Sequence, residues 1–153
     1  FNLVLNRQDP DKDFKWFSFG DYGLDLYSNG VMVSRKLLAS NPKAVAGLVR
    51  AINKAAIAVA KDQNAGMKAA VNYDNLINEG VEKRRLQFSF EKLIVSPEMK
   101  EIGIGDIRDD RMTRAIGIVV EGYQLARAPE VAEIFSREFL PPRKDRELVY
   151  TAN

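Results

Sequence analysis

Hydrophobic positions from residue 45 onward recur every three or four residues, which is the spacing of an amphipathic helix. Asn41 followed by Pro42 is a strong start signal, because asparagine caps free backbone N–H groups and proline suits the first helical position. We therefore expect a helix from Pro42 to about Lys61. Its apolar stripe, which we expect to face the core, comprises Val45, Leu48, Val49, Ile52, Ala56 and Val59.

Similar signals predict further helices along the chain. Ser34 is expected to cap a short helix that reaches Ala39, and Ser96 followed by Pro97 should start a helical piece that ends at Gly103. Other helices are expected over residues 65–71, over residues 76–94, from residue 109 or 110, and from residue 129.

Strand-like segments are few and short, at residues 3–5, 14–19 and 31–33. A compact sheet needs more strands than these. The pattern therefore predicts an α/β fold with two or three strands that complete a sheet begun elsewhere. The alternative is a self-sufficient helical interaction module without a ligand.

The segment from Trp16 to Pro42 reads W-F-S-F-G-D-Y-G-L-D-L-Y-S-N-G-V-M-V-S-R-K-L-L-A-S-N-P and stands apart from these regular patterns. It gathers aromatic residues, acids and glycines in a short loop. Glycines allow backbone conformations that other residues avoid, and such loops often carry binding groups. A strand–loop–strand connection whose aromatics belong to the core explains the same composition.

Composition excludes several classes of function. The chain has 153 residues and a net charge of +2, which gives no argument for nucleic acid binding. It contains neither cysteine nor histidine, so it cannot form a disulfide, a Cys/His zinc site or a nucleophile–histidine pair within itself. Its longest apolar run, residues 55–60, is far too short to span a bilayer.

Two further motifs have ordinary structural explanations. Gly103-Ile104-Gly105 lacks the third glycine of a dinucleotide-binding motif, since Arg108 occupies that position. A cluster of aspartates follows it without the spacing of a calcium loop, which favours helix N-capping. The cluster comprises Asp106, Asp109 and Asp110.

The loop carries a family resemblance. The run Asp21-Tyr22-Gly23-x-Asp25-x-Tyr27-x-Asn29-Gly30, then an apolar segment, Ser34 and Asn41-Pro42 before an alanine-rich helix, resembles the NMT1/THI5-like solute-binding proteins. Gly103-Ile104-Gly105-Asp106 and Phe139-Leu140-Pro141 fit the later part of that family. The resemblance covers nearly the whole chain but only about the second half of such a receptor.

The resemblance implies the C-terminal portion of a two-lobed type II periplasmic-binding-protein fold, here a fragment of a larger protein. Residues 1–33 would supply strands and the cleft or hinge loop, and residues 34–153 the helical portion. The implied function is that of the solute-binding component of an ABC importer. The implied location is the periplasm, or the outside of the membrane as an anchored lipoprotein. Its partners would be a small solute and the membrane permease, with a homodimer or swapped assembly of the fragment possible.

Binding rather than covalent chemistry is expected, with no catalytic residue, metal or cofactor. Trp16 and Tyr22 offer flat faces for stacking, Asp21 can accept from an amine or amidine edge, and Asn29 can donate and accept. Asp25 and Tyr27 can equally be structural partners of the turn. The alternative within the same fold is an enzyme like the fungal pyrimidine-precursor synthases, which use pyridoxal phosphate and a histidine.

Overall fold

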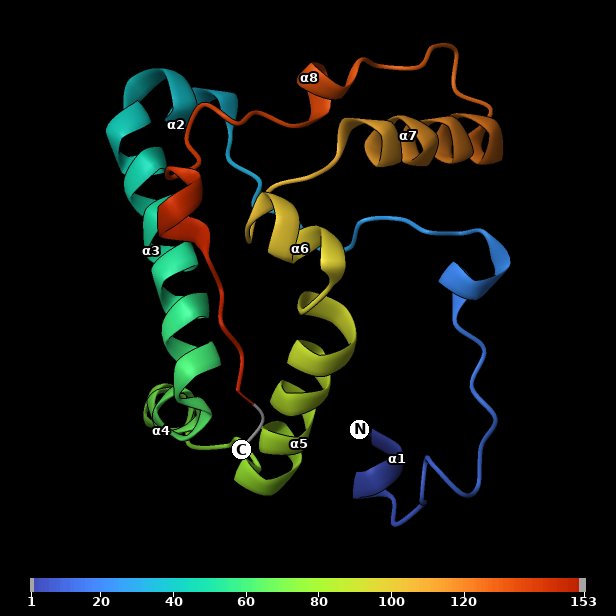
Figure 1. The fold of residues 1–153 in the computed structure, drawn as a ribbon, viewed down its shortest axis with the longest axis vertical. Coiled ribbons are helices and arrows are strands. Elements are labelled where there is room, and N and C mark those ends of the chain that lie inside the picture. Colours follow the sequence, from blue (N-terminus) through green and yellow to red (C-terminus); the bar gives the residue numbers. More distant parts are fainter. Residues whose placement is uncertain (1, 152–153) are drawn as a thin grey trace. The chain divides into compact units, whose positions relative to one another are not determined.

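The computed structural model describes residues 2–151, and the regular structure among these residues is helical, without a β-strand (Figure 1). The predicted α/β fold class, with two or three strands, is therefore wrong for this part of the chain. Phe1 and residues 152–153 lie outside the described residues. The helices are α1 (Asn2–Leu5), α2 (Arg35–Ser40), α3 (Pro42–Lys61), α4 (Gln63–Tyr73), α5 (Glu79–Ser89), α6 (Pro97–Ile102), α7 (Asp109–Tyr123) and α8 (Val131–Ile134), with 3₁₀ turns η1 (Phe19–Tyr22) and η3 (Arg143–Arg146) and a π-helical turn η2 (Phe90–Ile94).

Each predicted strand has a different conformation. Residues 3–5 belong to α1, and residues 14–18 and 31–33 have no regular structure. A strand is stable only when another strand satisfies its backbone groups. Short apolar runs do not by themselves distinguish a strand from a helical turn, so tertiary partners decide between the two.

Helix starts follow the side-chain caps. The Ser34 Oγ accepts a hydrogen bond from the Leu37 amide at 3.1 Å and thereby starts α2. The Asn41 Oδ1 accepts from the Ala44 amide at 3.0 Å and starts α3. Both bonds satisfy N–H groups that have no partner within the helix, which confirms the predicted starts.

The buried face of α3 differs from the predicted stripe. Leu48 and Ile52, expected in the core, are 44% and 42% exposed, whereas Asn53 and Ala60 are 6% and 0% exposed. Val45 is buried as expected. The buried side is therefore rotated toward Asn53, a polar residue that an apolar pattern does not count.

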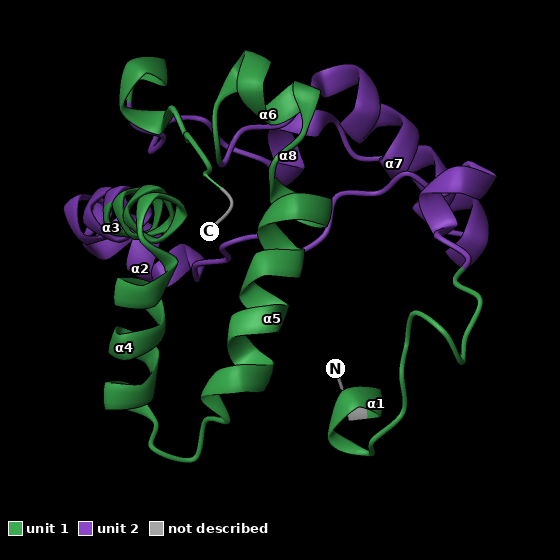
Figure 2. Ribbon diagram, turned by 60° about the horizontal axis from the view of Figure 1, so that its bottom comes forward, with its two compact units in different colours: residues 1–16, 51–104, 142–153 green, residues 17–50, 105–141 purple. Residues whose placement is uncertain are grey.

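The described residues divide into two compact units, shown in different colours in Figure 2. Unit 1 combines residues 2–16, 51–104 and 142–151, and unit 2 combines residues 17–50 and 105–141. None of the helices in the described part of the chain is both long and apolar enough to cross a membrane.

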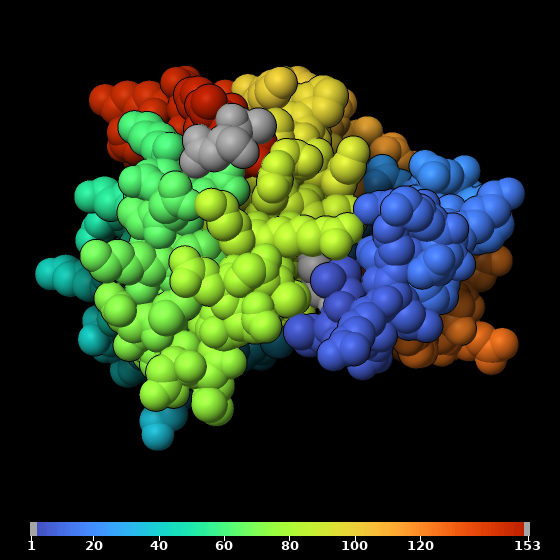
Figure 3. Space-filling model, turned by 90° about the horizontal axis from the view of Figure 1, so that it is seen from below, coloured from blue at the N-terminus to red at the C-terminus, as the bar shows by residue number. Residues whose placement is uncertain are grey.

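The apolar core of unit 1 gathers around Phe90 and Ala60. The final segment, residues 142–151, which we call the C-terminal strap, runs between α3 and α5 and contributes Leu148 to this core (Figure 1). The strap's Tyr150 ring stacks on Phe90 with 5.2 Å between centroids. Helices α4 and α5 pack together and form a continuous surface of this unit in Figure 3.

Candidate functional site

Residues 17–30, which we call the aromatic loop, lie in unit 2 and expose large aromatic side chains. Phe17, Phe19 and Tyr22 are 62%, 76% and 72% exposed. Phe19 and Tyr22 belong to the 3₁₀ turn η1, and Gly23 ends this turn in the left-handed region with φ of +88°. The interpretation that these aromatic side chains belong to the core is therefore wrong, since all three are mostly exposed.

The four predicted binding residues fall into both units. Asp21, Tyr22 and Asn29 belong to the aromatic loop of unit 2, and Trp16 belongs to unit 1. The side chains of Asp21 and Asn29 are exposed. Within unit 2 the loop therefore presents a carboxylate, an amide and a phenol ring close together in sequence.

Trp16 has a fixed edge and an open face. Its indole Nε1 donates a hydrogen bond to the Pro10 carbonyl at 2.8 Å, and its ring tilts against Phe14 at 6.3 Å between centroids. The side chain is nevertheless 66% exposed. An indole held by its N–H group can still offer a face for stacking.

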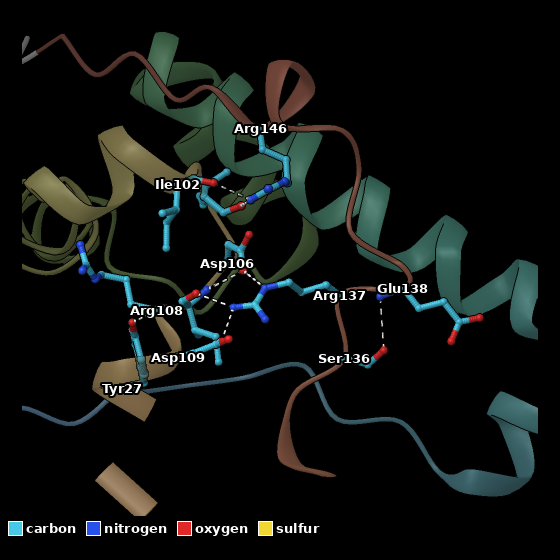
Figure 4. A network of polar contacts seen from close by, with 11 residues as sticks. Tyr27, Ile102, Asp106, Arg108, Asp109, Ser136, Arg137, Glu138 and Arg146 are labelled. Carbon is cyan, nitrogen blue, oxygen red and sulfur yellow. Dashed lines mark hydrogen bonds and ion pairs between the residues drawn. The ribbon is translucent and has the colours of Figure 1, made fainter. Parts of the chain in front are cut away.

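Asp25 and Tyr27, in the same loop, contact the start of α7. The Arg111 Nη2 lies 2.5 Å from the Asp25 carboxylate, and the Arg111 guanidinium stands 4.2 Å from the centre of the Tyr27 ring. The Tyr27 hydroxyl accepts a hydrogen bond from the Arg108 backbone amide at 2.8 Å (Figure 4). These two loop residues thus have structural partners, as one of the sequence interpretations proposed.

The α7 entry, residues 106–111, is also held by an arginine that follows α8. Arg137 donates through Nε to the Asp106 carboxylate and through Nη2 to the Asp109 carboxylate, each at 2.7 Å (Figure 4). The same Nη2 donates to the Ile107 carbonyl at 2.7 Å. Because a planar guanidinium presents its donors in a rigid fork, Arg137 fixes the path of the backbone into α7.

The aspartates of the α7 entry do not cap the helix as predicted. The N-cap residue of α7 is Arg108, and its side chain makes no capping bond. Asp106 and Asp109 instead pair with Arg137, while Asp110 pairs with Arg108 and Arg114, each at 3.1 Å. Opposite charges nearby thus determine the role of these carboxylates.

Electrostatics of unit 2 reflect these pairs. Hydrogen bonds from Arg108 and then Arg114 lower the pKa of Asp110 to about 2. The hydrogen bonds that Arg137 donates to Asp109 and Asp106 raise the pKa of its guanidinium above the usual value. Both shifts favour the charged forms, so the pairs stay ionised at neutral pH.

The arginines of this network are the residues that sequence reasoning missed. Arg108 and Arg111 are three positions apart, a spacing that places side chains on neighbouring turns at a helix start. That spacing beside two acids was the available signal, but it does not reveal a partner 86 residues away. The described residues bring together no group of three His, Cys, Asp or Glu side chains suited to a metal.

A comparison with known protein families finds a match for the first part of the chain. Residues 2–65 match the family model described as NMT1/THI5 like. The match confirms the resemblance over those residues, which include the aromatic loop and α3 and amount to less than half of the 153 residues. No curated protein and no solved structure matches the chain.

Proposed function

We propose that the chain is part of an extracytoplasmic solute-binding component of an ABC importer. The observation that carries the proposal is the coincidence of the NMT1/THI5-like match with a loop whose aromatic and polar side chains are exposed. Such a component captures a small polar solute between two lobes and delivers it to a membrane permease. The proposed partners are that solute and the permease, and the proposed compartment is the periplasm or the outer face of a membrane.

The aromatic loop supplies the chemistry of recognition. The Tyr22 ring stacks on a flat or apolar face of the solute, and the Asp21 carboxylate accepts hydrogen bonds from its N–H groups. The Asn29 amide both donates and accepts, and so fixes the orientation of the solute. Trp16, just before the loop in sequence, offers a second stacking face. Recognition of this kind involves no covalent step.

Binding is tested by calorimetry with taurine and an aminopyrimidine, which carry N–H groups that Asp21 can accept from, and with nitrate, an anion that carries none. Trp16 is the single tryptophan of the chain, so its fluorescence independently reports a solute that stacks on it. Loss of one buried polar partner costs about 1–3 kcal/mol, so Asp21→Ala and Asn29→Ala should each weaken binding by about 5- to 150-fold. Wild-type affinity in both variants would contradict the assignment of the loop.

A matched control is the exposed carboxylate of Glu121 on α7, in the same unit but outside the loop. Glu121→Ala should leave the affinity unchanged. Chromatography of the aminopyrimidine after incubation separates binding from catalysis, since consumption of the compound would identify an enzyme like the pyrimidine-precursor synthases.

A further inference from the structure

We propose that Arg111 is a positioning residue that holds the aromatic loop in its binding conformation. The proposal rests on the proposed function and extends it to residues that do not themselves touch the solute. Arg111 acts through Asp25 and Tyr27, so we call these three residues the loop anchor.

Two contacts join Arg111 to the loop, and their geometry is complementary. The guanidinium edge meets the Asp25 carboxylate at 2.5 Å, while its centre stands 4.2 Å from the centre of the Tyr27 ring. A single planar cation therefore fixes two loop residues through an ion pair and a cation–π contact. The Arg111 side chain is 22% exposed and the Asp25 side chain 59%, so the cation is mostly shielded from water while its carboxylate partner is not.

A third contact joins the loop to the backbone of the same helix. The Tyr27 hydroxyl accepts from the Arg108 amide at 2.8 Å. Amides at the start of a helix have no acceptor within the helix, so this hydroxyl supplies one. Tyr27 is thus held at its ring by Arg111 and at its hydroxyl by Arg108, which restricts both its position and its tilt.

The helix start is itself fixed from another segment. Arg137 binds the Asp106 and Asp109 carboxylates and the Ile107 carbonyl, each at 2.7 Å. The anchor therefore ties the loop to a braced segment of backbone. Bracing matters because a binding residue must be held within about 0.5 Å of its productive position.

The position of the anchor in the sequence explains its effect on binding. Asp21 and Tyr22 precede Asp25, and Asn29 follows Tyr27 by two residues. The anchored residues thus lie between the proposed binding residues on both sides. Release of the anchor would therefore free the binding residues on both sides of it together.

The experiment combines affinity with backbone order. The variants are Arg111→Gln, which removes the cation, and Tyr27→Phe, which removes only the hydroxyl. The matched control is Arg114→Gln, one turn further along α7, whose partner is Asp110 rather than a loop residue. Affinity is measured with whichever of nitrate, taurine and the aminopyrimidine the wild type binds.

Order is measured without ligand by amide hydrogen exchange at the turn. The reporters are the hydrogen-bonded amides of Asp21, Gly23 and Leu24. Arg111→Gln should weaken binding roughly tenfold or more and speed exchange at these amides, whereas Arg114→Gln should change neither. Arg111→Lys should restore part of the affinity, because lysine keeps the charge near Asp25 but loses the planar fork.

The outcomes separate the two proposals. Faster exchange with weaker binding in the Arg111 variant, and not in the control, supports the anchor. Unchanged exchange overturns it, and so does faster exchange with wild-type affinity. If the wild-type chain binds none of the three compounds, the proposed function has failed, and the positioning role fails with it. If the wild type binds and Arg111→Gln binds equally well, only the positioning role of Arg111 is overturned.

Discussion

Different interactions stabilise the core of unit 1 and, separately, the α7 entry of unit 2. Unit 1 packs Phe90, Ala60 and Leu148 at 2%, 0% and 8% exposure. The α7 entry is held by ion pairs such as Arg137 to Asp109, whose side chains are 43% and 65% exposed. Buried apolar side chains carry no charge that salt can screen or acid can titrate, whereas exposed charge pairs respond to both.

Arg146 of unit 1 has a different role from the arginines of the α7 entry in unit 2. In unit 1 Arg146 is 6% exposed, and its Nη1 donates to the carbonyls of Ile102 and Ile104 at 3.0 and 3.1 Å. It thereby satisfies backbone groups where α6 ends, and the C-terminal strap is fixed to the rest of the unit. In unit 2 the arginines mainly pair with carboxylates near the surface, where each pair contributes little stability but defines a geometry.

The comparison predicts the largest loss of stability in the unit 1 core. Phe90→Ala should reduce the free energy of unfolding by about 3–5 kcal/mol, because it removes a buried ring and leaves a cavity beneath Tyr150. Urea denaturation followed by circular dichroism measures the change. Phe88→Ala, two residues away and 46% exposed, is the control and should cost clearly less. Equal costs would mean that the core is not centred on Phe90.

Loss of the buried arginine should be the next largest effect. Arg146→Met keeps much of the side-chain volume but leaves two partly buried carbonyls without this donor, which should cost about 1–3 kcal/mol. The exposed neighbour Lys144→Met should change stability by less than about 0.5 kcal/mol. A stable Arg146→Met variant would refute the role of the strap in closing unit 1, and the same urea titration decides it.

An effect of similar size is expected at Gly103, where the backbone has a positive φ. Its φ is +85°, and an added Cβ would lie 3.0 Å from the Arg143 Cδ. Gly103→Ala should therefore cost roughly 1–3 kcal/mol through backbone strain and displacement of the strap. Gly117→Ala in α7 meets nothing within 4 Å and should be neutral or stabilising by up to about 1 kcal/mol. Gly103→Ala should lower the midpoint temperature of thermal unfolding, and Gly117→Ala should leave it unchanged or raise it.

Low pH should weaken the ion pairs of unit 2 and leave the apolar core of unit 1 unchanged. The pKa of Asp110 is lowered to about 2 by Arg108, and that of Glu133 to about 2 by Arg127. Both values lie below the roughly 4 expected in an unfolded chain, so the stabilisation is present above pH of about 4 and is lost as pH falls toward 2. Carboxyl NMR titrations should show these low midpoints, and midpoints near 4 would mean that the pairs do not form in solution.

The sequence by itself determined the local features of the chain. Helix starts at Ser34, Asn41 and Ser96 could be predicted, because a cap is a hydrogen bond between residues only three positions apart. The aromatic loop was likewise recognisable from its composition and its family motif, which the match over residues 2–65 confirms. Whether Trp16, Asp21, Tyr22 and Asn29 bind a solute stays a prediction.

Tertiary structure decided what depends on distant partners. The predicted strands were wrong because a strand needs a neighbour that local pattern cannot supply, and α3 buries Asn53 rather than Ile52 because packing selects its face. Asp25 and Arg111 are 86 residues apart, and no helical or strand period relates them. A long-range contact forms only when folding has brought both segments together, so its partners become visible in the three-dimensional structure alone.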